Sequence, residues 1–252
     1  MKNPKHILIT GASSGIGEAL ALHYAAPGIR LALSGRDAAR IEAVADACRA
    51  KGAEAQGGVL DVRDRDAMAG WIRESDAAQP LDLVVANAGI AASSTGTTEL
   101  AGMADRVFET NVGGVFATVH PALDLMIPRG RGQIAIVSSI AGYQGLSSTP
   151  AYSASKAAVK AYGEALRGRL GKTGVEINVI CPGFVVSRIT ERNTHKMPFL
   201  TAADKSARAI ARGLARNKGR ITYPWQMHLI ARLWVNTPMR VMDWVAKHLP
   251  EK

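Results

Sequence analysis

The sequence predicts an α/β protein built as three layers, with helices on both faces of a doubly wound parallel sheet. Short apolar segments rich in Ile, Val and Leu recur along the chain, and longer Ala-rich segments with helical spacing separate them. The apolar segments do not alternate with polar residues, which indicates strands that are buried on both faces. Because this strand–helix alternation continues over most of the chain, we expect one sheet and a single domain over residues 1–252.

Five strands are predicted from strong apolar patterns, and two more from weaker ones. The strong patterns cover residues 6–10, 30–34, 82–86, 133–138 and 175–181. Residues 53–60 add a weaker strand, and residues 220–223 add a last one. A helical segment follows most of them, so neighbouring strands are expected to run parallel.

Helical segments fill the intervals between these strands. They are predicted at residues 16–26, 37–51, 64–77, 103–119, 151–171 and 203–216. Asp37 and Asp64 stand where N-cap residues are expected. Residues 184–200 are predicted to be irregular, and the chain after residue 224 is predicted to be a helical tail interrupted at Pro238.

The composition excludes several classes of protein. The chain of 252 residues is 47% hydrophobic and 21% charged, which rules out wholesale disorder. Its two cysteines, Cys48 and Cys181, cannot form a disulfide framework and suit a reducing compartment. No apolar run approaches the roughly 20 residues that span a bilayer, and residues 7–9 are too short for a signal-peptide core. We therefore expect a cytoplasmic protein.

The net charge of +10 is concentrated at the C-terminal end. Residues 188–252 contain 13 Lys/Arg and 4 Asp/Glu, whereas the first 187 residues contain 18 and 17. Residues 224–252 combine basic residues with apolar ones at helical spacing, which predicts an amphipathic basic tail. Such a tail fits packing on the core, contact with another subunit, or a helix on anionic lipid. No known nucleic-acid-binding motif accompanies the charge, so nucleic acid is not expected as a partner.

A glycine-rich turn follows the first predicted strand. Thr10-Gly11-Ala12-Ser13-Ser14-Gly15-Ile16-Gly17 leads from that strand into a helix. Glycines let a backbone turn tightly and approach a pyrophosphate, while the start of a helix presents free N–H groups. The alternative is a tight turn that binds nothing, but the order of strand, turn and helix favours a nucleotide site.

The end of the second strand indicates which nucleotide binds. Sites for NAD usually place a carboxylate there to accept from the ribose 2′-hydroxyl. This chain has Gly35 followed by Arg36, and a guanidinium can pair with a 2′-phosphate. Asp37 is expected to cap the next helix instead. The alternative for Arg36 is a solvated surface arginine, and on balance the pattern favours NADP(H) over NAD(H).

Two further polar groups follow predicted strands. Asp61-Val62 comes after the third strand, where a carboxylate could accept from an adenine amino group or simply form a turn. Asn87-Ala88-Gly89 ends the fourth strand, at the carboxyl edge where ligands bind in such sheets. A simple turn is again the alternative.

Tyr152 and Lys156 form the sharpest pair. Their spacing of four residues places the phenol and the ammonium on one face of a helix. A nearby ammonium is expected to lower the pKa of a tyrosine, which could then exchange a proton with a substrate oxygen. Ser138-Ser139 ends a buried strand at the same edge, where a hydroxyl can donate to a carbonyl oxygen. The alternatives are that Tyr152 and Lys156 have this spacing by chance and that the serine only hydrogen-bonds to the backbone of its loop.

Taken together, these residues resemble the short-chain dehydrogenase/reductase family in its form of about 250 residues. Thr10–Gly17 matches the family's T-G-x-x-x-G-x-G turn, and Asn87-Ala88-Gly89 matches its N-A-G motif. Asn111, Ser139, Tyr152 and Lys156 match its catalytic set in type and spacing. Pro182-Gly183 matches the P-G after the sixth strand, and Ser187 stands where a threonine is usual. The ordered set is far more specific than any single match.

The resemblance implies a Rossmann-type sheet of about seven parallel strands and hydride transfer at a nicotinamide. Tyr152 would be the acid/base, Ser139 would hold the substrate oxygen, and Lys156 would bind the nicotinamide ribose and tune Tyr152. Asn111 would hold a water that links Lys156 to solvent. The rest of the cofactor site would be lined by Ile90, Val112, Pro182, Gly183, Val185 and Ser187.

The resemblance also suggests the assembly and the substrate region. Such enzymes are usually homodimers or homotetramers, with the helices around 103–119 and 151–171 in the contacts. The segment 184–216 would build a substrate lobe, and its apolar residues suggest an apolar substrate such as a lipid-derived ketone. His195 and His228 lack the spacing of a metal site, so no metal is expected.

Two functions are therefore under consideration. The first is an NADP(H)-dependent oxidoreductase that interconverts a carbonyl and a secondary alcohol. The alternative is a cofactor-binding scaffold or sensor whose basic tail engages a membrane or a protein partner. The complete set of Asn111, Ser139, Tyr152 and Lys156 favours the enzyme, because a binding role would not require all four.

Overall fold

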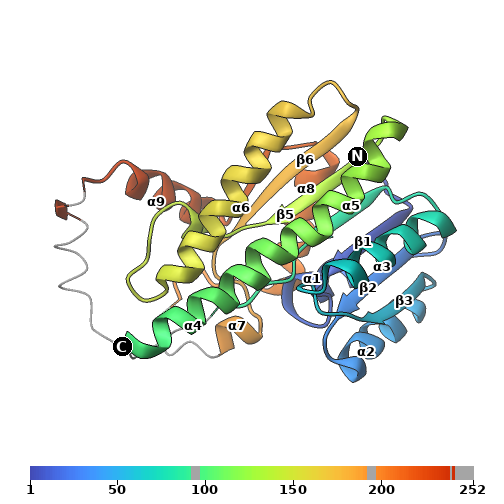
Figure 1. Ribbon diagram of the computed structural model, residues 1–252, viewed down its shortest axis with the longest axis horizontal. Helices are drawn as coiled ribbons and strands as arrows, with labels where there is room; N and C mark the ends of the chain where they lie inside the picture. The colour runs from blue at the N-terminus through green and yellow to red at the C-terminus, as the bar shows by residue number, and fades with distance from the viewer. Residues whose placement is uncertain (92–96, 192–196, 239, 242–252) are drawn as a thin grey trace.

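The seven predicted strands form one parallel sheet in the order β3-β2-β1-β4-β5-β6-β7 (Figure 1). This computed structural model describes residues 1–91, 97–191, 197–238 and 240–241. The register places Ile7 of β1 between Leu31 of β2 and Leu83 of β4. The strands are β1 (His6–Thr10), β2 (Arg30–Gly35), β3 (Glu54–Val59), β4 (Leu83–Ala86), β5 (Gly132–Val137), β6 (Val175–Pro182) and β7 (Arg220–Tyr223). Each lies within two residues of its predicted bounds, and the predicted fold class is confirmed.

Helices cover both faces of the sheet. Their bounds are α1 (Gly15–Tyr24), α2 (Ala38–Arg49), α3 (Arg65–Ala78), α4 (Thr97–Phe108), α5 (Gly114–Arg129), α6 (Pro150–Arg169), α7 (Arg188–Glu191), α8 (Ala203–Ala215) and α9 (Trp225–Val235). A π-helical turn, η1 (Glu109–Gly113), joins α4 to α5, and a short 3₁₀ helix, η2 (Ile140–Gly142), follows β5. The expected N-caps are confirmed, because the Asp37 and Asp64 carboxylates accept from the backbone N–H groups of Arg40 and Ala67.

The core has two halves, one on each face of the sheet. Successive residues of a strand point to opposite faces, so Ile7 and Ile9 of β1 belong to one half and Leu8 to the other. The first half packs against α1, α2 and α8, and the second against α3, α5 and α6. All of these strand residues are fully buried, which explains why the apolar segments did not alternate.

One crossover has the opposite hand to the others. The path β5–α6–β6 and the path β6–α8–β7 move in the same direction along the sheet. Their helices nevertheless lie on opposite faces, since α6 packs with the second half of the core and α8 with the first (Figure 1). Parallel crossovers are nearly always right-handed, so β6–α8–β7 is the left-handed exception. It places α8 directly against α1.

The helix predicted at 103–119 is wrong in its bounds. The structure has a longer helical run, from Thr97 of α4 through η1 to Arg129 of α5. The prediction stopped short of Pro121, yet Pro121 and Pro128 both lie inside α5. A proline removes one helical N–H, but the flanking hydrogen bonds and the packing of α5 on the sheet keep the run helical.

The C-terminal prediction is confirmed only in part. Residues 225–235 form α9, as a helical tail requires. Residue 239 and residues 242–252, which include Trp244 and the predicted apolar positions Met242, Val245 and Leu249, lie outside the described residues. The same holds for residues 192–196, with His195, in the segment predicted to be irregular, where the structure adds the short helix α7. No helix in the described part is long and apolar enough to cross a membrane.

Candidate active site

The residues selected from the sequence gather at the carboxyl edge of the sheet. The glycine-rich turn follows β1, Asn87 follows β4, Ser139 follows β5 and Gly183 follows β6. Parallel strands end at the same edge, so residues far apart in the chain come together there. Tyr152 and Lys156 lie in the first turns of α6, which begins at that edge.

The glycine-rich turn needs its glycines for shape and for space. Gly11 and Gly15 have positive φ angles of 65° and 62°. A Cβ on Gly17 would lie 2.4 Å from the Gly11 carbonyl oxygen and 2.6 Å from Asn87 Nδ2. Ser14 is the N-cap of α1 but makes no side-chain cap hydrogen bond, which leaves the first helical N–H groups available to phosphate oxygens. The turn therefore fits a dinucleotide pyrophosphate.

Asn87 and Thr10 hold the turn in place. The Asn87 side-chain amide donates to the carbonyl oxygens of Thr10 (2.9 Å) and Gly11 (3.1 Å). The Thr10 hydroxyl accepts from the backbone N–H groups of Asn87 (3.1 Å) and Ala88 (3.2 Å). The Asn87 side chain therefore braces the turn from β4, and Ala88 lies so close that Gly11 has no room for a side chain.

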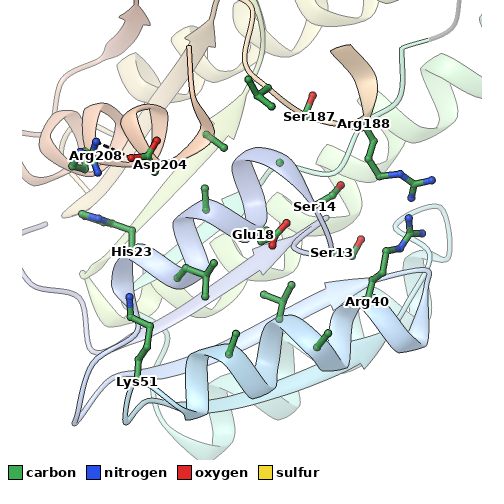
Figure 2. A pocket seen from close by; sticks show the side chains of 18 residues that line it. Ser13, Ser14, Glu18, His23, Arg40, Lys51, Ser187, Arg188, Asp204 and Arg208 are labelled. Atoms are coloured by element: carbon green, nitrogen blue, oxygen red, sulfur yellow. Dashed lines mark ion pairs between the residues drawn. The ribbon is translucent and has the colours of Figure 1, made fainter. Parts of the chain in front are cut away.

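A basic groove opens beside the turn. It is a cavity of about 830 Å³ between α1, α2, α8 and the segment before α7, and Ser13, Ser14, Gly15 and Ser187 line it. Figure 2 shows the Arg40 and Arg188 guanidinium groups pointing toward each other at its mouth. Arg40 is paired with Asp37 at 2.6 Å, whereas Arg188 has no ion pair with any residue that the structure describes. Neither arginine was selected from the sequence, because they meet only through the fold.

The end of β2 carries no carboxylate. Gly35 is buried, and a Cβ there would lie 3.1 Å from the Ser13 side chain. Arg36 is exposed and forms no ion pair among the described residues. The nearby Asp37 caps α2 and pairs with Arg40, as its predicted capping role requires.

Asp61 forms a turn and an ion pair. Its carboxylate accepts from the backbone N–H of Arg63 (3.0 Å) and from the Arg63 guanidinium (2.7 Å). These hydrogen bonds, with the Arg63 charge, lower the pKa of Asp61. Asp61 and Arg63 also line a second, smaller cavity beside Glu109. The neighbouring Val62 is buried against Gly114.

Asn111 lies in the π-helical turn and is fully buried. Its side chain accepts from the Ile90 N–H (2.8 Å) and donates to the Ile90 carbonyl (2.9 Å) and to Ser155 Oγ (3.0 Å). A Cβ on Gly89 would lie 3.1 Å from Asn111 Oδ1 and 3.3 Å from Lys156 Nζ. Asn111 thus ties the end of β4 to α6. Ser155, which precedes Lys156, was missed because the sequence does not show its contact with Asn111.

The Lys156 side chain reaches the end of β5. Its ammonium donates to the Val137 carbonyl at 2.9 Å and lies 5.7 Å from the centre of the Tyr152 ring. Burial lowers the pKa of Lys156 to about 8. The predicted pairing of these two side chains on one helix face is present.

Tyr152 is half-buried and lies beside Ser139. Burial raises the pKa of Tyr152, and a hydrogen bond with the Ser139 side chain opposes that rise without overcoming it. The expectation that Lys156 would lower this pKa is therefore wrong for this structure, because burial dominates. Ser139 Oγ also accepts from the Ala141 N–H at 3.1 Å, which fixes the hydroxyl at the start of η2.

The two serines that follow β5 have different neighbours. Ser138 Oγ donates to the Lys156 carbonyl at 2.7 Å and so anchors α6, while Ser139 lies beside Tyr152. A Cβ on Gly142 would lie 2.7 Å from the same Lys156 carbonyl oxygen, so η2 and α6 are in direct backbone contact. The distance between Ser139 and Tyr152 depends on this contact.

The segment after β6 returns to the glycine-rich turn. The Gly183 N–H donates to the Tyr223 carbonyl at 2.7 Å, and Val185 is buried. Ser187 lies against the turn, because a Cβ on Gly15 would be 2.9 Å from the Ser187 Cβ. Thr190 was missed; its hydroxyl accepts from the Ser187 N–H (2.9 Å) and donates to the Val185 carbonyl (2.8 Å).

The remaining selected positions are apolar. Ile16 and Val112 are half-buried and pack against the two halves of the core, and Ile90 meets Asn111 through its backbone. Pro182 is the last residue of β6 and is buried. Among the described residues, no group of three or more His, Cys, Asp or Glu side chains could hold a metal ion.

Comparison with known proteins decides the family. Residues 5–198 match the family model described as short chain dehydrogenase. The chain belongs to the short-chain dehydrogenase/reductase family. It is an NAD(P)-dependent oxidoreductase of that family, and the resemblance inferred from the sequence is confirmed.

Relatives and solved structures of this family resemble the chain along most of its length. A Myxococcus xanthus protein described only as an uncharacterized oxidoreductase is 38% identical over 243 residues, which cover 96% of each chain. A short-chain type dehydrogenase/reductase from Mycobacterium marinum has a TM-score of 0.78 at 26% identity, covering 86% of this chain and 93% of its own. A short chain dehydrogenase from Mycobacterium paratuberculosis bound to NAD has a TM-score of 0.76 at 25% identity, covering 88% and 95%.

Proposed function

We propose that this short-chain dehydrogenase/reductase interconverts a carbonyl and a secondary alcohol with NADP(H), using Tyr152 as the acid/base. The observation that carries the proposal is that the Ser139 and Tyr152 side chains lie together beside the buried Lys156. The pair lies at the sheet edge that also holds the glycine-rich turn.

The site residues supply the proton chemistry. A nicotinamide cofactor, when bound, donates or accepts the hydride. Ser139 donates a hydrogen bond to the substrate oxygen, which stabilises the negative charge that develops there. Tyr152 gives its phenolic proton to that oxygen in reduction and takes it back in oxidation. Because its pKa is raised, Tyr152 is protonated at neutral pH, which is the form that reduction needs.

Lys156 and Asn111 are proposed to support this exchange. Lys156 holds the nicotinamide ribose and keeps a positive charge near Tyr152. Asn111 holds a water that links Lys156 to solvent. The contacts of Asn111 with Ile90 and Ser155 support a fixed position for both residues, since Ser155 precedes Lys156 on α6.

The preference for NADP(H) rests on the charges around the groove. Gly35 supplies no carboxylate to repel a 2′-phosphate, and Asp37 is neutralised by Arg40. Arg40 and Arg188 line the groove, and Arg36 is exposed at the end of β2, so all three add positive charge to this side of the proposed cofactor site. Arg36 is proposed to bind the 2′-phosphate, and the other two arginines to strengthen the local positive potential. The Mycobacterium paratuberculosis neighbour is bound to NAD, so the preference needs a direct test.

Replacing Arg36 by Gln tests that preference. The variant should bind NADPH about 10- to 100-fold more weakly, as expected for a lost charge-assisted hydrogen bond, with NADH affinity nearly unchanged. Fluorescence titration with both reduced cofactors measures the two affinities. Equal losses for NADPH and NADH, or a wild type that binds NADH as tightly as NADPH, would refute the NADP(H) proposal.

The Tyr152→Phe variant tests the reaction itself. It should bind NADPH like the wild type and lose most turnover in a screen of ketones and alcohols followed by nicotinamide absorbance. Wild-type turnover in that screen separates the enzyme from a sensor, which would bind cofactor without turnover. Activity retained by the Phe variant would contradict the role of Tyr152.

The substrate is proposed to be apolar, such as a lipid-derived ketone. In the segment 184–216, the proposed substrate lobe, Phe199 and Leu200 are exposed. Their exposure next to the site supports an apolar ligand. Within the ketone screen, kcat/KM should rise with the length of the alkyl chain.

A homodimer or homotetramer in the cytoplasm is proposed as the working form. The faces of α5 and α6 support this assembly, because Phe116, His120 and Tyr162 form a partly exposed aromatic cluster there. Such clusters are enriched where subunits meet.

A further inference from the structure

The helix α9 exposes large apolar side chains along one side. Trp225, Leu229 and Leu233 are 71%, 52% and 61% exposed, and their spacing of four residues aligns them. These three residues are called the α9 face. On the opposite side of the helix, Met227 and Ala231 are buried, and α9 contacts β7 and η2. The helix is therefore attached to the body of the protein while its most apolar face remains uncovered by the described residues.

Further apolar side chains are exposed near the end of α9, although helical spacing places Trp234 and Val235 on other sides of the helix than the α9 face. Trp234, Val235 and Val241 are all exposed near the end of the helix. Figure 1 shows α9 at one end of the molecule, away from β3 and α2 at the other. An apolar surface of this extent on an otherwise ordinary globular protein marks a contact with a partner.

The charge of the surrounding chain indicates which partner. From Lys205 to Met242 the sequence contains eight Lys/Arg and no Asp or Glu, although Arg208 and Arg220 are paired with Asp204 and Glu164. Arg232 is exposed and lies between Leu229 and Leu233 in the helix, on the side of the α9 face. Trp and Leu side chains accompanied by Arg, without any acidic residue, have the composition of helices that lie in a membrane interface.

We propose that the α9 face binds the surface of an anionic lipid bilayer. A second copy of this chain fits less well, because a two-fold contact would bring Arg232 and the same acid-free segment against themselves. An anionic surface instead attracts the segment and accepts the apolar side chains below its headgroups. The Arg232 stem can lie along the apolar layer while its guanidinium reaches a headgroup.

This contact would leave α9 between the lipid and the candidate active site. The helix α9 packs on η2, which begins directly after Ser139, and the His228 ring lies 6.4 Å from the Tyr143 ring at the end of η2. The proposal does not depend on the reaction or on the cofactor preference, since it concerns a surface that contains none of the selected site residues.

Vesicle co-sedimentation of the full chain tests the proposal. Wild type should sediment with vesicles of phosphatidylcholine mixed with phosphatidylglycerol, should bind pure phosphatidylcholine much less, and should be released by salt. The variant Trp225→Ser/Leu229→Ser/Leu233→Ser should bind the anionic vesicles at least about tenfold more weakly. A matched control is Val59→Ser on β3, which removes a side chain that is 60% exposed and should change nothing. NADPH binding and reduction of a water-soluble ketone should stay at wild-type levels in all variants.

A second measurement needs no destabilising change. Bromine atoms on the acyl chains quench tryptophan that enters the bilayer, so brominated anionic vesicles should quench wild type more than Trp225→Phe. Equal binding to both vesicle types, unchanged binding of the triple variant, or no quenching difference would overturn the proposal. So would a triple variant that alters the oligomer size in sedimentation velocity while binding vesicles like wild type, because the face would then join two copies of the chain.

Discussion

Lys156 keeps a charged group inside the protein. Only 4% of the residue is exposed, and its ammonium has a single hydrogen bond, to the Val137 carbonyl, among the described residues. Burial lowers its pKa to about 8, so at pH 7 it is still mainly protonated. A buried cation without a carboxylate partner destabilises the folded state. The site therefore maintains this ammonium at the expense of stability.

The pH dependence of the free energy of unfolding should reveal the cost of burying the Lys156 ammonium. The folded pKa of about 8 lies below the unfolded value of 10.5, so the unfolded chain binds more protons between these values and stability rises with pH. Relative to Lys156→Met, the wild type should gain about 3 kcal/mol between pH 7.5 and 10.5, from about 2.5 pKa units at 1.36 kcal/mol each. Denaturant unfolding of both proteins across this range measures it. A flat difference between wild type and Lys156→Met would contradict the shift.

Residue types and spacing were sufficient to predict that Ser139, Tyr152 and Lys156 lie close together. The Tyr152–Lys156 spacing and the serines that follow β5 are local patterns that read directly from the sequence. Ser155, Arg40 and Arg188 were missed because their relevant contacts join distant segments. Thr190 was missed although its contacts with Ser187 and Val185 are local, because no helical or strand pattern marks that segment. The pKa of Tyr152 was predicted in the wrong direction because its sign depends on burial, which spacing alone does not provide.

The contact between η2 and α6 sets the geometry of the proposed acid/base pair. Ser139 begins η2, Tyr152 lies in the first turn of α6, and Gly142 allows the two backbones to touch. Any side chain at Gly142 would push the two elements apart, since its Cβ would lie 2.7 Å from the Lys156 carbonyl. The 3₁₀ helix η2 thus holds the Ser139 hydroxyl close to α6.

Gly142→Ala should separate Ser139 from Tyr152 by a fraction of an ångström to an ångström. We expect kcat to fall roughly 10- to 100-fold while NADPH affinity stays within about twofold, because the glycine-rich turn is untouched. Stability should fall by about 1–3 kcal/mol, as for other overpacked sites. Gly145→Ala is the control: a Cβ there meets nothing within 4 Å, so kinetics and stability should stay at wild-type values. Unchanged kcat in Gly142→Ala would show that the contact does not set the geometry.

Elements were predicted well wherever one pattern dominated. The strands and the capped helices α2 and α3 follow from apolar runs and from Asp37 and Asp64. The run from α4 to α5 was not recovered, because a π-helical turn shifts the helical phase at Glu109–Gly113 and Pro121 resembles a stop signal. The π-helical turn and Pro121 are both tolerated because α5 packs on the sheet, and this packing is a tertiary effect that the local sequence does not show.

The strands at the centre of the sheet are better protected against local opening than the strands at its edges. Strands β1, β4 and β5 are buried throughout and have a neighbour on each side. Strand β3 is an edge strand whose residues are exposed or half-buried, and β7 is the other edge. The cost of opening a strand should therefore rise from the edges inward.

Hydrogen exchange should follow this order. Amides of β1, β4 and β5 should exchange most slowly, and those of β3 fastest among the strands, with β7 between them because α9 packs on it. Mass spectrometry of peptides from exchanged protein gives the ranking. Faster exchange in β1 than in β3 would contradict it.

The handedness of the last crossover could not be predicted from the sequence. Right-handed connections are the rule, so the pattern alone would place α8 on the face that holds α6. The structure places it on the opposite face, where Ala207, Ile210 and Leu214 join Leu20 and Ala21 in the same half of the core. The hand of a crossover is decided by which face remains open for the helix, and that is a property of the assembled sheet.

The left-handed crossover also has a consequence during synthesis. Because α8 packs on α1, the part of α1 that faces α8 stays uncovered until a segment made almost 190 residues later has left the ribosome. At ordinary elongation rates of about 5–20 residues per second, that delay lasts roughly 10–40 s. The nascent chain therefore carries its glycine-rich turn through that interval on a helix whose packing is still incomplete.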